Sequence, residues 1–502
     1  MMIASRLKSR IFSGLLTTAM LLSACQAQVT SFSSSAQNAN LALQPTQIVQ
    51  APDQSVPTPF PTRPLYSPGE FVDYTAQTGD TLPALASRFN TTVEEILAAN
   101  TFIPKTATTM PPGMPMKIPI YYLPLWGSPY QIIPDSLFID GPAQVGFNTE
   151  DFVTAHPGWL KNYTEYAADA NRTGAQIVDY IALSYSVSPR LLLALLEYQT
   201  GALSQPQLSP DLQEYPLGYQ SWDHKGLYMQ LNWAANLLNN GYYGWRTQHL
   251  KSIVYKDGRM ERFDPWQNAA TVSLHNYFNH IFDYPEFAKA ISPDGIARTY
   301  SDLFGDPWQA DQTHIPGSLT QPEFSLPFEP GSVWAYTGGP HTGWGLGEPY
   351  SAIDFAPPSV AGGCITTSEW ATAVAAGVVV RSETGIVVLD LDGDGDERTG
   401  WDVFYLHVGT DGRVPVGTKL NQGDHIGHPS CEGGTATGTH VHIARKYNGE
   451  WVPAEGTLAF NLEGWVAHDG SAPYLGTLTR FSQTITACQC SNRASFIQSE
   501  KK

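Results

Sequence analysis

Five side chains in the last third of the chain could together bind and use a metal ion. His440 and His442 flank one valine in a run typical of a β-strand, and residues two apart in a strand point to the same face. Two imidazoles on one face suit zinc, or one metal ligand beside one general base. His341 and Asp354 add a nitrogen and an oxygen, and two histidines with one aspartate leave a fourth zinc position open, as in catalytic sites. His407, in another predicted strand, is a further candidate acid or base.

These residues lie in region 330–485, which is rich in glycine and β-branched residues and therefore predicts strands joined by turns. Four aspartates alternate with other residues over 390–396 and fit the start of an EF-hand calcium loop. The twelfth position of that loop holds Trp401 in place of glutamate, and no flanking helices are predicted. We therefore expect either a calcium loop or an acidic hairpin turn.

The candidate metal-binding and catalytic residues and the motifs around them occur in five short segments, 340–343, 351–356, 404–408, 423–427 and 437–443. Together these pieces resemble the lysostaphin-like (LytM-type) zinc endopeptidases of bacterial cell walls, whose domain is an antiparallel β-sheet. The resemblance implies that His341, Asp354 and His442 bind Zn²⁺ and that His407 and His440 are catalytic.

One feature departs from that family. Twelve residues, 342–353, separate His341 from Asp354, which is more than the family usually has. Within this insertion, 344–350 is rich in glycine and proline. Such a segment can loop out and return Asp354 to the metal.

The N-terminus predicts export. Arg6, Lys8 and Arg10 precede an apolar stretch, 11–22, that is too short to span a bilayer, and Leu-Ser-Ala stands before Cys25. This pattern resembles a bacterial lipoprotein signal, which implies a signal peptide over 1–24, cleavage before Cys25 and lipid on its thiol. The alternative is an ordinary secretory signal with a chance cysteine. Either reading puts the mature chain outside the cytoplasm, and the polar composition of 25–70 predicts a flexible linker after the lipidated cysteine.

Residues 71–122 predict a strand, two helices and a second strand. Asp80 or Thr81 can cap the first helix, and Thr92 can cap the second, with Glu95 completing a capping box. The Gly-Asp-Thr-Leu motif before the first helix and the closing Ile-Pro pair resemble the LysM family. That resemblance implies a small βααβ module that binds glycans containing N-acetylglucosamine.

Residues 125–325 predict a mainly α domain. Its most apolar helix begins at Pro189, with Ser188 as N-cap, and ends at Gly201. The helix resembles the first catalytic helix of lysozyme-like lytic transglycosylases, where a glutamate near the end is the general acid. Gln199 holds that position here, and an amide cannot donate the proton. We expect a lysozyme-like domain that is noncatalytic and can still hold glycan; the alternatives are an unrelated helical spacer and an active glycosidase.

Composition limits the partners. The chain has 502 residues with 28 basic and 46 acidic side chains, and this net charge of −18 argues against nonspecific nucleic-acid binding. In an exported protein we expect Cys364 and Cys431 to form a disulfide. The partners of Cys488 and Cys490 stay open, and 486–502 is expected to be a tail.

The sequence thus predicts a multidomain protein that combines a LysM module, a mainly α middle domain and a mainly antiparallel β peptidase domain. We expect a membrane-anchored, extracytoplasmic peptidoglycan hydrolase whose zinc endopeptidase cleaves cross-bridge or stem peptides. The alternatives are a noncatalytic peptidoglycan-binding scaffold or amidase activator, and a lytic transglycosylase that acts through the middle domain. The presence of all five residues of the metal-site pattern favours the enzyme.

Overall fold

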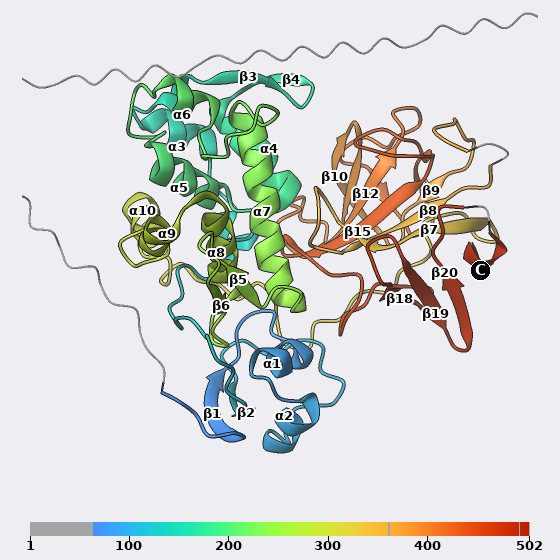
Figure 1. The fold of residues 1–502 in the computed structure, drawn as a ribbon. Coiled ribbons are helices and arrows are strands. Elements are labelled where there is room, and N and C mark those ends of the chain that lie inside the picture. Colours follow the sequence, from blue (N-terminus) through green and yellow to red (C-terminus); the bar gives the residue numbers. More distant parts are fainter. Residues whose placement is uncertain (1–63, 360–361, 491, 501–502) are drawn as a thin grey trace, which may run out of the picture. The chain divides into compact units, whose positions relative to one another are not determined.

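The computed structural model describes residues 64–359, 362–490 and 492–500 (Figure 1). The predicted signal peptide, Cys25 and most of the predicted linker lie outside these residues. Among the helices that the structure describes, none combines the length and the apolar character needed to cross a membrane.

The first folded region is a βααβ unit. Strand β1 (Glu70–Thr75) pairs antiparallel with β2 (Pro115–Ile120), and between them the chain forms α1 (Leu82–Arg88) and α2 (Val93–Ala99). Thr81 caps α1, and α2 begins with the expected capping box. The core of this unit includes four fully or nearly fully buried residues, Leu82, Phe89, Ile96 and Ile118.

The middle region is mainly helical. Its helices are α3 (Thr149–Ala155), α4 (Gly174–Tyr185), α5 (Pro189–Thr200), α6 (Pro210–Glu214), α7 (Leu227–Thr247), α8 (Ala269–Ile281), α9 (Tyr284–Ala290) and α10 (Ile296–Phe304). Short 3-10 helices cover Asp135–Leu137, Pro142–Gln144 and Trp159–Asn162. Two small hairpins complete the region, β3 (Thr164–Ala167) with β4 (Ala170–Thr173) and β5 (Ser252–Val254) with β6 (Met260–Arg262).

Helix α5 forms as the sequence predicts. Ser188 accepts a hydrogen bond from the Leu191 amide, Pro189 occupies the first turn, and Gly201 ends the helix in the left-handed conformation. Its leucines are fully buried because they face the hydrophobic core of the middle region.

The C-terminal region is built on a nine-stranded sheet in which every pair is antiparallel. Its strands are β7 (Val333–His341), β8 (Ala352–Ala356), β10 (Gly377–Glu383), β11 (Gly385–Asp390), β12 (Trp401–Val408), β13 (Lys419–Leu420), β15 (Val441–Tyr447), β16 (Glu450–Trp451) and β21 (Phe496–Gln498). They run in the order β13-β10-β11-β12-β15-β8-β7-β21, with β16 paired to β15.

Smaller sheets accompany it. A four-stranded sheet contains β17 (Asn461–Leu462), β18 (Trp465–Asp469), β19 (Gly476–Arg480) and β20 (Gln483–Thr486), and β9 (Ala371–Thr372) pairs with β14 (His425–Gly427). The stretch 486–502, expected to be a tail, instead supplies a 3-10 turn (Arg493–Ser495) and the edge strand β21. Ile497 is buried against the core of this region, which explains why the chain continues the sheet.

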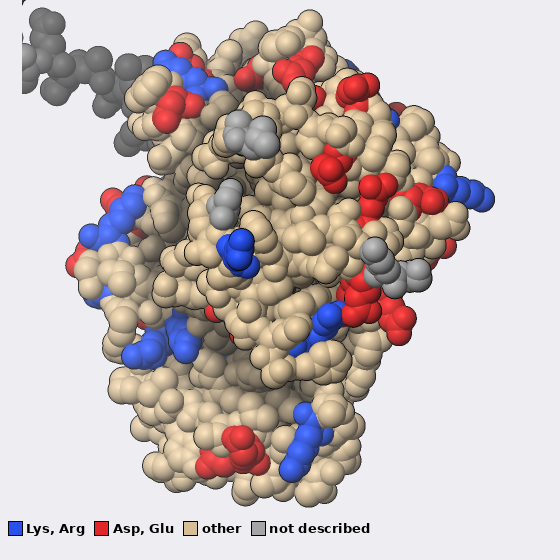
Figure 2. Space-filling view, turned by 90° about the vertical axis from the view of Figure 1, so that its right-hand side faces the viewer, with Lys and Arg blue, Asp and Glu red and all other residues tan. Residues whose placement is uncertain are grey.

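The two faces of the main sheet have different roles. Val403 and Tyr405 on β12 point into a core made within the C-terminal region. Phe404 and Leu406, on the other face, belong to the same hydrophobic cluster as the middle region. On the surface seen in Figure 2, described lysines and arginines lie in small separate groups, in keeping with the acidic composition.

Candidate metal centre

Three neighbouring strands bring the predicted metal ligands together. His341 ends β7, Asp354 lies in β8, and His442 lies in β15. Since β8 is hydrogen-bonded to both other strands and Asp354 is the direct partner of His442, the three side chains converge. All three are buried.

The ligand atoms form a compact triangle. His341 Nε2 lies 3.1 Å from His442 Nδ1, and Asp354 Oδ1 lies 3.3 Å from each of these nitrogens. A tetrahedral zinc ion about 2.0–2.1 Å from its ligands needs them roughly 3.3 Å apart. The separations and the mixed nitrogen and oxygen donors therefore fit Zn²⁺. Three protein ligands leave the fourth tetrahedral position open.

Backbone carbonyls set the protonation of the ligand histidines. His341 Nδ1 lies 2.8 Å from the Gly339 carbonyl, and His442 Nε2 lies 3.2 Å from the Gly343 carbonyl. A carbonyl only accepts, so these nitrogens carry the protons and the opposite nitrogens keep their lone pairs for a metal.

His407 and His440 form a second pair beside the triangle. Their ring centroids lie 4.4 Å apart, and His440 Nε2 lies 3.8 Å from Asp354 Oδ2. The Nδ1 atoms of His407 and His440 face the carbonyls of Glu432 and Gly438, which leaves each Nε2 available to handle a proton.

A β-bulge puts His407 in this place. The ladder between β11 and β12 shifts register where Gly385 pairs with Val408 and Ile386 with Leu406, so His407 is the extra residue. His407 has a φ of 64°, a left-handed conformation that is uncommon for a residue with a Cβ and is enriched at functional sites.

Burial disfavours protonation of two of the site's imidazoles. It lowers the pKa of His442, and it lowers the pKa of His407 to about 3, with the charges of His440 and His442 contributing. Burial alone would raise the pKa of Asp354, but His341 and His440 outweigh it and hold that pKa well below its usual value. An ionised carboxylate beside imidazole nitrogens is suited to bind a cation.

The insertion between His341 and Asp354 does loop out. The amides of Leu346 and Glu348 donate to the side-chain carbonyls of Asn236 and Asn240 on α7, the latter at 2.7 Å. The segment is thus held by the middle region, and the chain re-enters the sheet in time to place Asp354 at the site.

A cavity of about 550 Å³ adjoins the site, and its lining includes Asp354, Thr439 and His440. The Cys364–Cys431 disulfide lies near its wall, since the Thr439 amide donates to the Gly363 carbonyl. The pairing that the sequence left open is also visible, because Cys488 and Cys490 form a disulfide with each other.

Sequence reasoning missed one aromatic neighbour. Tyr474 stacks on His341 with ring centroids 4.0 Å apart. Nothing in the residues around Tyr474 signals this contact, because it depends on a loop between two strands of a different sheet.

Helix α5 has no carboxylic acid at the position that the general acid occupies in lysozyme-like glycosidases. Gln199 donates to the Tyr277 hydroxyl, and the Glu197 carboxylate accepts the amides of Leu203 and Ser204. Glu197 thereby closes the turn after α5.

The comparisons with known proteins match two segments. A family model described as LasA, N-terminal domain, matches residues 131–317, and the LysM domain model matches residues 74–119. The helical region is thus similar to the LasA N-terminal domain, and its likeness to lysozyme-like domains stays a prediction.

Individual proteins are also similar to parts of this chain. Protease LasA of Pseudomonas aeruginosa strain UCBPP-PA14 is 26% identical over 345 residues, which is 64% of this chain and 75% of that protein. The beta-lytic metalloendopeptidase of Lysobacter enzymogenes is 29% identical over 161 residues, 32% of this chain and 86% of that protein. Among solved structures, the M23 metalloprotease pseudoalterin from the deep sea has a TM-score of 0.29 and 24% identity, covering 34% of this chain and 96% of that one.

The curated relatives and the converging side chains of β7, β8 and β15 agree with each other. A LysM module comes first in the described chain, and the metal-site pattern comes in the antiparallel region. The chain is similar to protease LasA and to beta-lytic metalloendopeptidases, and its residues 74–119 match the LysM domain.

Proposed function

We propose that this chain is a zinc-dependent endopeptidase that cleaves cross-bridge or stem peptides of peptidoglycan outside the cytoplasm. One observation carries the proposal. The atoms His341 Nε2, Asp354 Oδ1 and His442 Nδ1 lie 3.1–3.3 Å from one another. Two further histidines stand beside them with an available Nε2.

His341, Asp354 and His442 would hold the zinc ion, which supplies a Lewis acid that polarises the scissile carbonyl. His440 Nε2 and His407 Nε2 would take the proton of the attacking water and return it to the leaving amine. Once protonated, the same rings would stabilise the negative charge that develops on the carbonyl oxygen. Their hydrogen bonds to backbone carbonyls hold both rings in place for this task.

The N-terminal parts would keep the enzyme at its substrate. The LysM domain would bind glycan strands that contain N-acetylglucosamine, and lipid on Cys25 would anchor the chain to a bacterial membrane. Cys25 lies outside the described residues, so mass spectrometry of the mature N-terminus is the test of the anchor.

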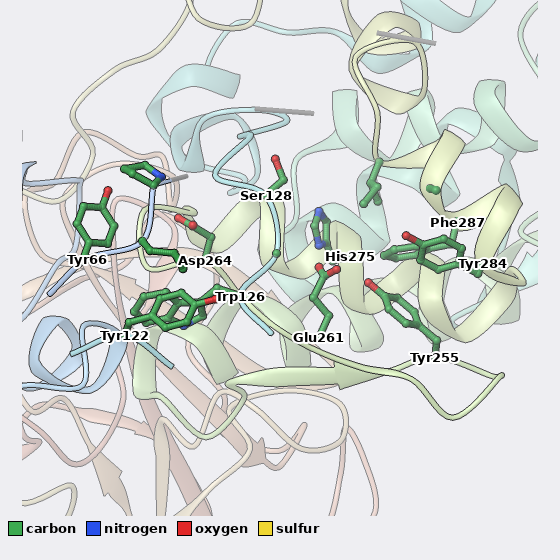
Figure 3. A pocket seen from close by; sticks show the side chains of 15 residues that line it. Tyr66, Tyr122, Trp126, Ser128, Tyr255, Glu261, Asp264, His275, Tyr284 and Phe287 are labelled. Carbon is green, nitrogen blue, oxygen red and sulfur yellow. The ribbon is translucent and has the colours of Figure 1, made fainter. Parts of the chain in front are cut away.

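The middle region offers a second surface suited to glycan. This region lines a cavity of about 380 Å³, and its walls carry the rings of Tyr122, Trp126, Tyr255 and Tyr284, with Glu261 between them (Figure 3). Aromatic faces can stack on sugar rings while a carboxylate accepts hydroxyl groups. We therefore propose that this region holds glycan without cleaving it, and loss of peptidoglycan binding in Trp126→Ala would support that role.

Two other functions receive less support. A noncatalytic scaffold would have no need of every metal-site residue, and all of them are present here. A lytic transglycosylase would need an acid where Gln199 stands.

The decisive experiment combines metal analysis with digestion of purified peptidoglycan. His442→Ala is expected to lose zinc and activity together. His440→Ala is expected to keep zinc and lose turnover. His425→Ala is the matched control. The His425 imidazole lies 2.9 Å from the Glu329 carboxylate, and His425 is not part of the triangle of candidate ligands.

Mass spectrometry of the products identifies the bond. New peptide termini support an endopeptidase, whereas anhydro-sugars would indicate a transglycosylase. Full zinc content and wild-type digestion by His442→Ala would overturn the assignment.

A further inference from the structure

Three aspartates gather at the turn between β11 and β12. Asp390 ends β11, and Asp392 and Asp394 follow in the turn. Carboxylate oxygens of the three lie within 4.8 Å of one another. In the described chain, none of the three forms an ion pair with a lysine or arginine, so their mutual repulsion is not relieved by the protein's own cations.

A fourth carboxylate supplies independent support. Asp402, on β12, is the direct cross-strand partner of Asp390, so both side chains lie on the same face of the sheet. Asp402 is fully buried, and neither of its carboxylate oxygens has a hydrogen-bond partner. An unpaired buried carboxylate is costly unless a cation or a proton compensates it.

The turn folds back toward Asp402. Asp392 Oδ2 lies so close to Gly400 that a Cβ there would clash with it, and Gly400 stands two residues before Asp402. Burial first, and then the charges of Glu397 and Asp390, raise the pKa of Asp402 well above its usual value, although the nearby Lys446 acts to lower it. Asp402 thus lies within electrostatic reach of the aspartate cluster, with unused oxygens on the same face.

We propose that Asp390, Asp392, Asp394 and Asp402 bind one Ca²⁺ ion. All four donors are carboxylate oxygens, which calcium prefers and zinc does not. The first three occupy positions one, three and five of an EF-hand-like loop. The twelfth residue is Trp401, and Asp402, one position later on β12, would supply the carboxylate that the loop lacks.

A calcium ion here would link β11 to β12, and β12 contributes to the candidate metal centre. β12 carries His407 and pairs with β15, which carries His442. Joining the end of β11 to the start of β12 would oppose fraying of the hairpin. The calcium site would exist whether or not the chain cleaves peptidoglycan.

The test is metal binding by the zinc-loaded full chain. Tb³⁺ serves as the luminescent probe, excited through the neighbouring Trp401, and Ca²⁺ is expected to displace it. Ca²⁺ titration calorimetry should then give a dissociation constant in the micromolar to millimolar range. Ca²⁺ should also raise the thermal midpoint, whereas Mg²⁺ at equal concentration should have a smaller effect.

Three variants distinguish a specific Ca²⁺ site from nonspecific attraction of Ca²⁺ to the negative charge of the turn. Asp392→Asn and Asp402→Asn should each weaken Ca²⁺ binding by about tenfold or more. Asp396→Asn is the matched control in the same turn, because the Asp396 carboxylate is already paired with Arg398 at 2.6 Å. It should bind Ca²⁺ within about twofold of the unmodified chain.

Asp402→Asn makes a second, opposite prediction. Without Ca²⁺ it should unfold at a higher temperature than the unmodified chain, because it removes an unpaired buried acid. If this variant does not fold, the exposed Asp394→Asn replaces it. No saturable Ca²⁺ binding up to about 10 mM, or equal weakening by Asp396→Asn, would overturn the proposal.

Discussion

Gly338 in β7 lies directly opposite Asp354 in β8, and a Cβ atom at position 338 would collide with Asp354 Oδ2. The carboxylate therefore occupies the space that any other side chain at this position would fill. The second oxygen, Oδ1, is then free to lie 3.3 Å from both His341 and His442. Gly338 thus positions Asp354 within the candidate metal centre.

Gly338→Ala should therefore weaken zinc binding without removing a ligand. We expect the affinity to fall by about 10–100-fold, as when other groups that orient metal ligands are changed. Competition with a chromogenic chelator measures this. Gly434→Ala is the control, since a Cβ there would make only an ordinary contact of 3.7 Å with His407. Equal zinc affinity in Gly338→Ala and the unmodified chain would contradict the positioning role.

The bulge at His407 leads to a second prediction. Asparagine tolerates the left-handed conformation better than most residues, so His407→Asn should keep the bulge and the zinc content. It should lose about 10²–10⁴-fold in turnover, because the amide cannot accept the proton. His428→Asn serves as the control, since His428 packs against Trp370 and is not one of the residues that could hold the metal. A wild-type rate in His407→Asn would remove this residue from the mechanism.

Strand periodicity explains why one part of the site could be predicted and another could not. His440 and His442 share a face because residues two apart in a strand always do, and the structure places them so. The same rule would send His407 into the core with Val403 and Tyr405. Only the bulge turns His407 toward the other histidines, and no local residue pattern specifies a bulge here.

Long-range contacts account for the other differences. The capping box of α2 and the Gly201 end of α5 are local signals, so the helices that they delimit could be predicted. The edge strand β21 depends on pairing with β7, more than 150 residues earlier. The residues around β21 are polar, so the sequence pattern gave no signal of a strand. Tyr474 reaches His341 from a separate sheet for the same reason.

The Cys364–Cys431 disulfide should contribute to stability because it joins two cysteines with a sequence separation of 67. By the chain-entropy relation, replacing both cysteines with serine should lower the free energy of unfolding by about 4 kcal/mol. The Cys488–Cys490 bridge spans a separation of 2, so the matched double serine variant should lose less than half as much. Urea unfolding of the two variants measures the difference, and equal losses would contradict it.

His275 should make the stability of the middle region depend on pH. It is buried beside Phe263 and Phe287, and burial lowers its pKa from 6.5 to about 3. Between these values the unfolded chain binds a proton that the folded chain does not, so stability falls as the pH falls. From pH 7 to pH 4 this single residue should cost the folded state about 3 kcal/mol.

His275→Phe removes the titrating group while keeping a ring of similar shape. Above pH 7 the variant and the unmodified chain should differ only by a constant packing term. Toward pH 4 the variant should lose about 3 kcal/mol less, because its folded and unfolded states bind the same number of protons at this position. Urea unfolding followed by tryptophan fluorescence across this range tests the sign as well as the size. Parallel curves would mean that the imidazole titrates alike in both states and that its burial imposes no penalty on protonation.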